Sequence, residues 1–169
     1  MQLIRCTAKL LKELGLKATD LSVEPPFSFL GQWHANLIYI IRRKTLIFVN
    51  DRTLFNFIVP DVTRPQIREL TEQFCLMLSC VLAEEAVPDD VRQRILEEYA
   101  QIGFAKSLDR SVLGSCNDIA FRYKYRILEE GIQSWRVPEI IRELNRMPMR
   151  AIQYACPIDE PARLYGFAA

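Results

Sequence analysis

The only histidine of the 169-residue chain, His34, follows Trp33 and lies two residues before Asn36. A histidine can act as a general base or donate a hydrogen bond near neutral pH. Alternatively, Trp33 and Asn36 seal the edge of a strand, while a backbone carbonyl accepts a hydrogen bond from His34. A catalytic histidine usually has a positioned partner, and the adjacent sequence supplies none, so the structural interpretation is favoured.

A predicted helix between residues 111 and 130 carries a second group of candidates. At about 100° per residue, one line along this helix holds Ser111, Ser115, Asp118, Arg122 and Arg126. Arg110 stands directly before the helix, and Lys106 lies shortly before Arg110. The first N–H groups of a helix are unpaired and favour an anion, so serine and arginine there can hold a phosphate or carboxylate. Trp33 and His34 would then form the opposite wall.

These residues also have an ordinary structural explanation. Ser111 can cap the helix, and Asp118 with Arg122 can form an exposed ion pair worth about 0.3 kcal/mol. This explanation is the more common one for such a pattern. Asn117 and Asp118 lie one to two turns further along, so they would support a site rather than contact its ligand directly.

Three further features are weaker candidates. Asn145 and Arg146 lie near the end of a predicted helix, where an arginine also complements the helix dipole. The triplet at residues 42–44 can touch phosphates but is more often a solvated hairpin tip. Gly114 costs its helix about 1 kcal/mol relative to alanine, and it either permits close helix packing or marks the true helix start.

The elements that must position these residues follow from hydrophobic periodicity and turn signals. We predict strands at 3–6, 36–41 and 45–49; a third strand of the meander at 54–59, or a short helix at 53–57; a connection or strand at 103–106; and an edge strand at 151–157. Predicted helices cover 7–15, 63–86, 89–102, 111–130 ended by Gly131, and 138–146, and residues 17–32 are predicted to form a loop.

This order predicts an α+β protein of a single domain, residues 1–169. Its small sheet would be mostly antiparallel, built around a central hairpin or meander, and covered by a layer of about four helices. The composition agrees, because half of the residues are hydrophobic and a quarter are charged, which argues against disorder, collagen and coiled coil.

Charge and cysteine content limit the possible partners. The 22 Lys and Arg against 21 Asp and Glu give a net charge of +1, so there is no bulk attraction to nucleic acid or membranes. The 5 cysteines are odd in number, spread along the chain and without a metal-ligand spacing. We therefore predict reduced thiols, no metal, no cofactor, no membrane partner and a cytoplasmic protein. Common nucleotide-binding, zinc and serine-hydrolase motifs are absent from the sequence.

Several strings together resemble one protein family. They are Trp33-His34-Ala35-Asn36, Asn50-Asp51-Arg52-Thr53, Arg110-Ser111-Val112-Leu113-Gly114-Ser115, Asn117-Asp118 and Asn145-Arg146-Met147-Pro148-Met149. The chain resembles, over almost its whole length, a small prokaryotic family known only as a domain of unknown function, found in bacteria and some mobile elements. The resemblance implies no established activity and no catalytic residue.

Two functions from different classes therefore remain. The first is a binding or regulatory protein that recognises an anionic ligand, a nucleic-acid segment or a partner protein. The second is a small metal-independent enzyme, such as a nuclease or a toxin-like effector, with His34 as general base. The absence of known catalytic motifs and the single histidine favour the first.

Overall fold

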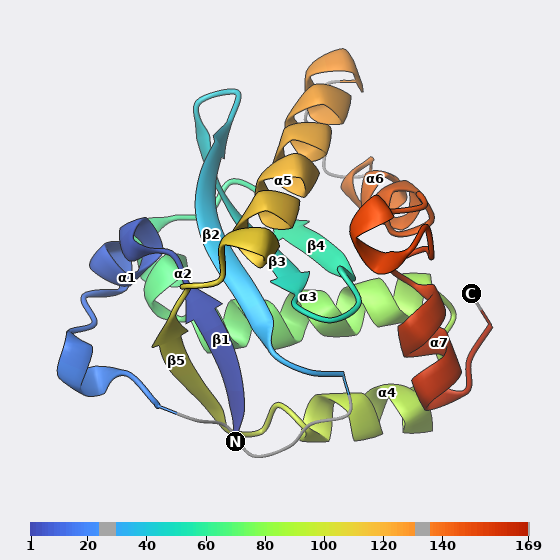
Figure 1. Ribbon diagram of the computed structural model, residues 1–169, viewed down its shortest axis with the longest axis horizontal. Coiled ribbons are helices and arrows are strands. Elements are labelled where there is room, and N and C mark those ends of the chain that lie inside the picture. The colour runs from blue at the N-terminus through green and yellow to red at the C-terminus, as the bar shows by residue number, and fades with distance from the viewer. Residues whose placement is uncertain (24–29, 131–135, 169) are drawn as a thin grey trace.

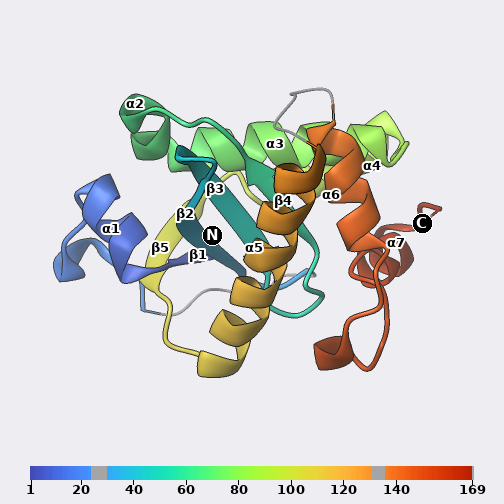
Figure 2. The same ribbon diagram turned by 90° about the horizontal axis from the view of Figure 1, so that it is seen from above.

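A computed structural model describes residues 1–23, 30–130 and 136–168 as one five-stranded sheet with helices on both faces (Figures 1 and 2). The strands are β1 (Gln2–Cys6), β2 (Trp33–Ile40), β3 (Arg43–Asn50), β4 (Asn56–Val59) and β5 (Ile102–Lys106). The α-helices of the described residues are α1 (Ala8–Leu14), α2 (Arg64–Arg68), α3 (Leu70–Glu84), α4 (Asp89–Glu97), α5 (Arg110–Glu130), α6 (Val137–Asn145) and α7 (Asp159–Tyr165). Two short 3-10 helices, η1 (Ala18–Asp20) and η2 (Arg150–Ile152), complete the described elements. The α+β class is confirmed.

The sheet is mixed, so the prediction of a mostly antiparallel sheet is wrong in that detail. Its strand order is β4-β3-β2-β1-β5, with β2, β3 and β4 forming an antiparallel meander. The N-terminal strand β1 lies inside the sheet and pairs in parallel with both β2 and β5. Parallel neighbours need long crossover connections, which here carry helices. The helices outnumber the predicted four, in part because one predicted helix is divided into α2 and α3 and because α7 was not predicted.

The central hairpin is confirmed, with a tighter turn than predicted. Ile41 and Arg42 both adopt the left-handed conformation, with φ of 46° and 64°, so two residues are enough to reverse the chain. Such turns match the right-handed twist of the flanking strands. The rest of the predicted charged break belongs to the strand, because Arg43 pairs with Ile40 and Lys44 pairs with Tyr39.

Most helix ends follow their sequence signals. The Thr7 side chain caps α1, and Gly15 ends it in the left-handed conformation, with φ of 75°. Thr63 and Gln66 form the expected capping box, but the predicted long helix divides at Glu69 into α2 and α3.

The C-terminal prediction is wrong, because 151–157 forms no strand and α7 follows it. The predicted helix end at Gly131 and part of the predicted loop, residues 24–29, lie outside the described residues.

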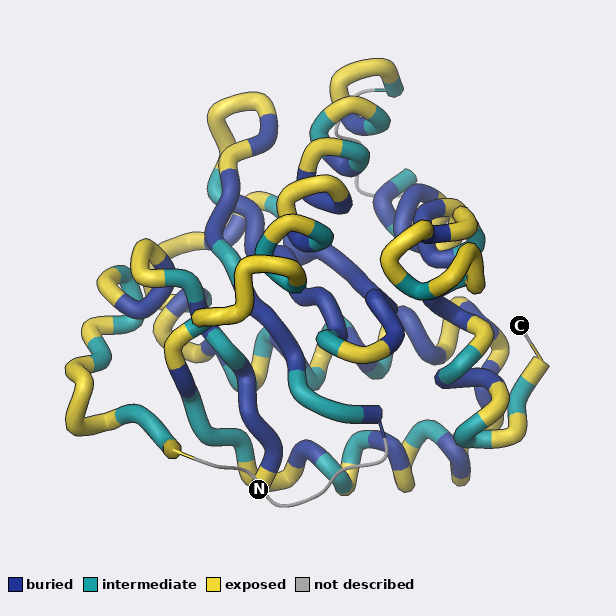
Figure 3. The backbone as a smooth tube through the Cα atoms, in the orientation of Figure 1, coloured by how far each residue is buried: buried dark blue, intermediate teal, exposed yellow. Residues whose placement is uncertain are grey.

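The hydrophobic core lies between the sheet and α3, with α5 covering the other face of the sheet (Figures 2 and 3). An aromatic cluster fills the α3 side and consists of Trp33, Phe48, Phe55, Phe57, Phe74 and Tyr99. Phe74 is the contribution of α3, and its ring centroid lies 5.1 Å from that of Trp33. No helix among the described residues combines the length and apolar composition needed to cross a bilayer.

Candidate functional site

Strand alternation decides which polar residues meet on the α5 side of the sheet. Successive side chains of a strand point to opposite faces, while residues paired across neighbouring strands share a face. Arg5 of β1 is paired with His34 of β2, so both belong to the same face. Trp33 therefore points to the opposite face, where its Nε1 donates a hydrogen bond to the Tyr99 hydroxyl at 2.8 Å. The prediction that Trp33 and His34 form one wall of a site is wrong for this reason.

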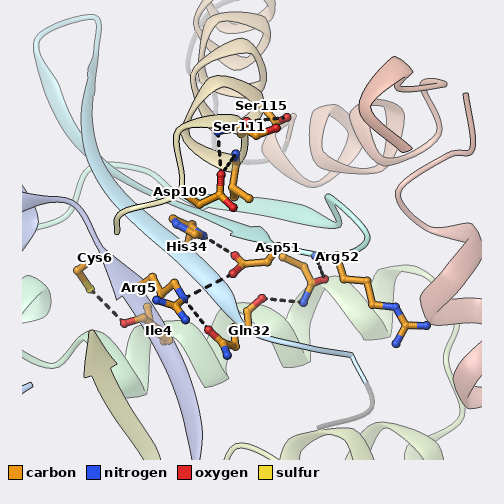
Figure 4. Close-up of polar contacts among 12 residues, drawn as sticks. Ile4, Arg5, Cys6, Gln32, His34, Asp51, Arg52, Asp109, Ser111 and Ser115 are labelled. Carbon is orange, nitrogen blue, oxygen red and sulfur yellow. Dashed lines mark hydrogen bonds and ion pairs between the residues drawn. The ribbon is translucent and has the colours of Figure 1, made fainter. Parts of the chain in front are cut away.

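His34 has a carboxylate partner that lies distant in sequence. Its Nδ1 makes a hydrogen bond with Oδ1 of Asp51, in the turn between β3 and β4 (Figure 4). Because a carboxylate only accepts, Nδ1 carries the proton in the neutral ring, and Nε2 is left with its lone pair. Nε of Arg5 lies 3.8 Å from the other carboxylate oxygen of Asp51 and donates to Oε1 of Gln32 at 2.5 Å.

The buried side chain of Asn50 holds Asp51 in place. Its Oδ1 accepts hydrogen bonds from the backbone N–H groups of Arg52 and Thr53, at 3.1 and 3.0 Å. Its Nδ2 donates to the carbonyl oxygen of Gln32 at 3.1 Å, and the Asp51 N–H donates to the same oxygen at 2.9 Å. These bonds fix the β3–β4 turn against the segment that enters β2, so Asp51 reaches His34 from a rigid position.

An open, shallow pocket of about 610 Å³ surrounds this group. It is lined by Arg5, Gly31, Gln32, His34, Asp51, Leu108 and Asp109. His34 is only 3% exposed, so it forms part of the floor rather than projecting into solvent. Its Nε2 is buried, and none of the described residues bonds to it.

His34 also borders a second, much smaller cavity of about 40 Å³ beneath α5. Asn36 and Asn117, both predicted site residues, line this cavity together with Thr7 and Cys116. Asn36 is held there by a hydrogen bond from the Thr7 hydroxyl to its Oδ1 at 2.8 Å. The rest of the lining is largely apolar, and a cavity of this size has room for one water molecule, which needs at least about 10–15 Å³.

The first turn of α5 differs from the prediction, because Asp109 rather than Ser111 caps the helix. Oδ1 of Asp109 accepts hydrogen bonds from the N–H groups of Ser111 at 2.8 Å and Val112 at 3.3 Å. The protein's own carboxylate therefore occupies the position that an external anion would take. Lys106 and Arg110 are exposed around this turn.

Two further predicted residues stay on the surface of α5. The Ser115 hydroxyl donates back to the carbonyl oxygen of Ser111 at 3.4 Å. Asp118 is exposed on the outer surface, and no ion pair between it and Arg122 occurs within the described structure.

Asn145 and Arg146 do not join this group, because both fasten α6 to other elements. Asn145 is fully buried, and its side-chain amide bonds the backbone and side chain of Asn56 in β4. Arg146 makes two hydrogen bonds to the buried Glu85 carboxylate, at 2.7 and 2.6 Å. The structure thus separates these two residues from the pocket around His34.

All five cysteines are free, as predicted. Burial raises the pKa of the Cys6 thiol to about 12, and burial together with the nearby Asp51 charge raises the pKa of Cys116 to about 12. Cys116 is therefore a neutral thiol, although it borders the small cavity beside His34. No group of three or more potential metal ligands occurs within the described parts of the chain.

A further large pocket, about 370 Å³, lies between α3 and α6. Its lining is mainly apolar and includes Met77, Val81 and Ile141. Glu85 and Arg142 stand at its border, but Glu85 is already bound to Arg146. We place the candidate site at His34 because its pocket combines an oriented histidine, a carboxylate and an arginine.

Of the residues that line the site, sequence reasoning identified only His34, and it missed the four other polar side chains, namely Arg5, Gln32, Asp51 and Asp109. A signal for Asp51 was present in the predicted hairpin. The observed two-residue turn at 41–42 places His34 opposite Val49, so Asp51 lies only two residues beyond it. No comparable pattern in the sequence indicated that Arg5 and Gln32 lie near His34. Their positions depend on the parallel pairing of β1 with β2, which is set by packing across the whole sheet.

The fold and site define an α+β protein with a mixed five-stranded sheet and a polar pocket over an Asp–His pair. The chain belongs to the family described as domain of unknown function DUF6933, whose model matches residues 3–160. No protein of curated function and no solved structure is significantly similar to the chain.

Proposed function

We propose that the protein binds a small anionic ligand in the open pocket, with Arg5 as its main contact. The free end of the Arg5 side chain is the observation that carries this proposal. Its Nε is used by Gln32, whereas no described residue accepts a hydrogen bond from either terminal nitrogen. The side chain is 29% exposed, so these nitrogens can form the two parallel hydrogen bonds with which arginine binds a carboxylate or phosphate.

The surrounding charges favour a small ligand over a nucleic-acid segment. Asp51 and Asp109 line the same pocket and would repel a chain of phosphates. A compact anion can contact Arg5 at one end while its own donor groups bond to these carboxylates. Lys106 and Arg110 are exposed near the pocket and add attraction for a single negative group.

Ligand titration of the full chain, followed by NMR, tests this function with inorganic phosphate, acetate and a short oligonucleotide as probes. We expect phosphate or acetate to shift the signals of residues 5, 31–32, 51 and 108–109. Arg5→Gln should weaken binding about ten- to a hundredfold, as expected for a charged hydrogen bond. Arg43→Gln, which removes the same charge from the exposed hairpin, serves as the matched control. Unchanged affinity in Arg5→Gln, or no shifts at these residues, would contradict the proposal.

A specific observation supports the enzyme alternative, in which His34 is a general base. Asp51 orients the ring and leaves the Nε2 lone pair available, as a base requires. The burial of Nε2 works against this function, because a substrate cannot reach a buried nitrogen in this arrangement. The neutral Cys116 thiol also offers no ready nucleophile, because burial raises its pKa to about 12.

An RNA-cleavage assay with a fluorogenic oligonucleotide separates the two functions. If His34 is the base, His34→Gln should lower the cleavage rate at least about a hundredfold, while circular dichroism stays unchanged. The absence of cleavage by the wild-type protein would argue against a nuclease. Cleavage that persists in His34→Gln would argue against His34 as its base.

A further inference from the structure

The outer face of α5 presents large apolar side chains that the fold leaves uncovered. Phe121 is 69% exposed, Tyr125 is 54% exposed and Leu128 is 66% exposed. The second half of the helix projects beyond the sheet, and its outward side is exposed along most of its length (Figures 1 and 3). Apolar groups gathered on one exposed face are typical of a protein–protein interface.

The spacing along this face is that of a helix-packing seam. Its members recur every three or four residues and are Gly114, Asn117, Asp118, Phe121, Lys124, Tyr125 and Leu128. A repeat that averages 3.5 residues keeps one stripe facing a partner helix over several turns. The inner face of α5, which includes Cys116, Ile119 and Tyr123, is already used by the core.

The seam is complementary to itself when two copies lie antiparallel. Matched pairs flank Phe121 at equal distances: Asp118 and Lys124 at three residues, Asn117 and Tyr125 at four, and Gly114 and Leu128 at seven. A two-fold axis between the two copies of Phe121 would therefore bring each Asp118 to the same level of the interface as Lys124 of the other copy, which lies across the seam from it. The same axis places each Leu128 over Gly114 of the other copy, where a large side chain meets the smallest one.

Gly114 supports this arrangement independently of charge. A glycine inside a helix costs about 1 kcal/mol relative to alanine. Nothing lies within 4 Å of where a Cβ would stand on Gly114, so contacts within its own protomer do not require a glycine there. A glycine at this position is explained if a second helix packs closely against it, because a side chain there would hold the two helices apart.

We propose that this face of α5 is the interface of a symmetric, antiparallel dimer of the protein. The occupant is a second copy because both the charges and the side-chain sizes along the seam match their own reversed order. The interface lies outside the Arg5 pocket and does not depend on the ligand proposed above.

Light scattering after size-exclusion chromatography tests the dimer over micromolar to millimolar concentrations. The wild-type mass should rise from the 19.7 kDa of the monomer toward twice that value. Asp118→Lys and Lys124→Asp should each raise the dimer dissociation constant at least about tenfold, because each places two like-charged pairs in the interface. Glu72→Lys, an exposed charge reversal on α3, should leave it unchanged.

Mixing the two single variants gives the decisive result. In the mixed dimer, one copy carries lysine at both positions 118 and 124 and the other carries aspartate at both, so each pair across the axis joins opposite charges. The mixture should therefore regain the dimer that neither variant forms alone. Gly114→Leu should stay a folded monomer at every concentration, because leucine blocks the space that Leu128 of the other copy would fill. At concentrations where the wild type is also monomeric, the variant should have the higher melting temperature, because leucine favours the helix. A wild-type monomer at all concentrations, or a mixture that stays monomeric, would overturn the proposal.

Discussion

Replacement of Phe74 by alanine is expected to lower the free energy of unfolding by about 3–5 kcal/mol. Phe74 is fully buried, and its ring centroid lies 5.1 Å from Trp33, 5.3 Å from Phe48 and 5.1 Å from Tyr99. Removing the ring leaves a cavity among packed neighbours from the sheet and from the segment after α4, which cannot fully collapse to fill it. The loss is large compared with the total stability of most domains, which is about 5–15 kcal/mol.

Urea denaturation followed by tryptophan fluorescence and circular dichroism measures this effect. Leu76→Ala is the matched control, because Leu76 lies on the same helix but faces solvent. This substitution should change the free energy of unfolding by no more than about 0.5 kcal/mol. Phe74→Leu keeps part of the volume and should remain folded if the alanine variant does not. A loss below about 1 kcal/mol for Phe74→Ala would mean that the ring is not the centre of this core.

The second large effect is expected for Asn145→Ala, at about 3 kcal/mol. Oδ1 of Asn145 accepts from the backbone N–H of Asn56 at 2.9 Å and from its Nδ2 at 3.1 Å, while Nδ2 of Asn145 donates to the Asn56 carbonyl oxygen at 2.7 Å. Tyr123 of α5 completes the group by donating to Oδ1 of Asn56 at 2.7 Å. Truncation leaves several buried polar groups of β4 without partners, and each such group costs about 1–3 kcal/mol.

Gln93→Ala provides the comparison, because it removes a side-chain amide from the exposed surface of α4. Its effect on the free energy of unfolding should be small, while Asn145→Ala should also speed hydrogen exchange of the β4 amides. Equal effects of the two substitutions would show that the bonds between α6 and β4 contribute little. Binding at the Arg5 pocket should survive Asn145→Ala at temperatures where the variant remains folded.

Local sequence signals predicted local structure well. Thr7 with Gly15, and Thr63 with Gln66, marked helix ends because caps depend on residues only a few positions apart. The hairpin followed from two apolar runs and a short break for the same reason. The position of β1 inside the sheet could not be predicted from local signals. Its partner strands depend on which apolar faces meet after the helices pack.

The candidate site shows the same limit. His34 was identified because it is unique, but its orienting Asp51 and the neighbouring Arg5 come from other parts of the sheet. The predicted helix start at residue 111 lies one residue after the observed start, and the side chain that caps the helix is Asp109 rather than Ser111. A capping aspartate and a capping serine produce similar sequence patterns, and they have opposite consequences for an incoming anion.

The position of β1 also bears on how the chain folds during synthesis. The β2–β3–β4 meander joins residues close in sequence, so it can form as soon as it leaves the ribosome. Pairing of β1 with β5 joins Gln2 to Ile102, about a hundred positions later. Until β5 emerges, one side of β1 remains an unpaired edge that other strands can join. Nascent chains that end before β5 are therefore the species most in need of chaperone protection, whereas chains extended past Lys106 can close the sheet.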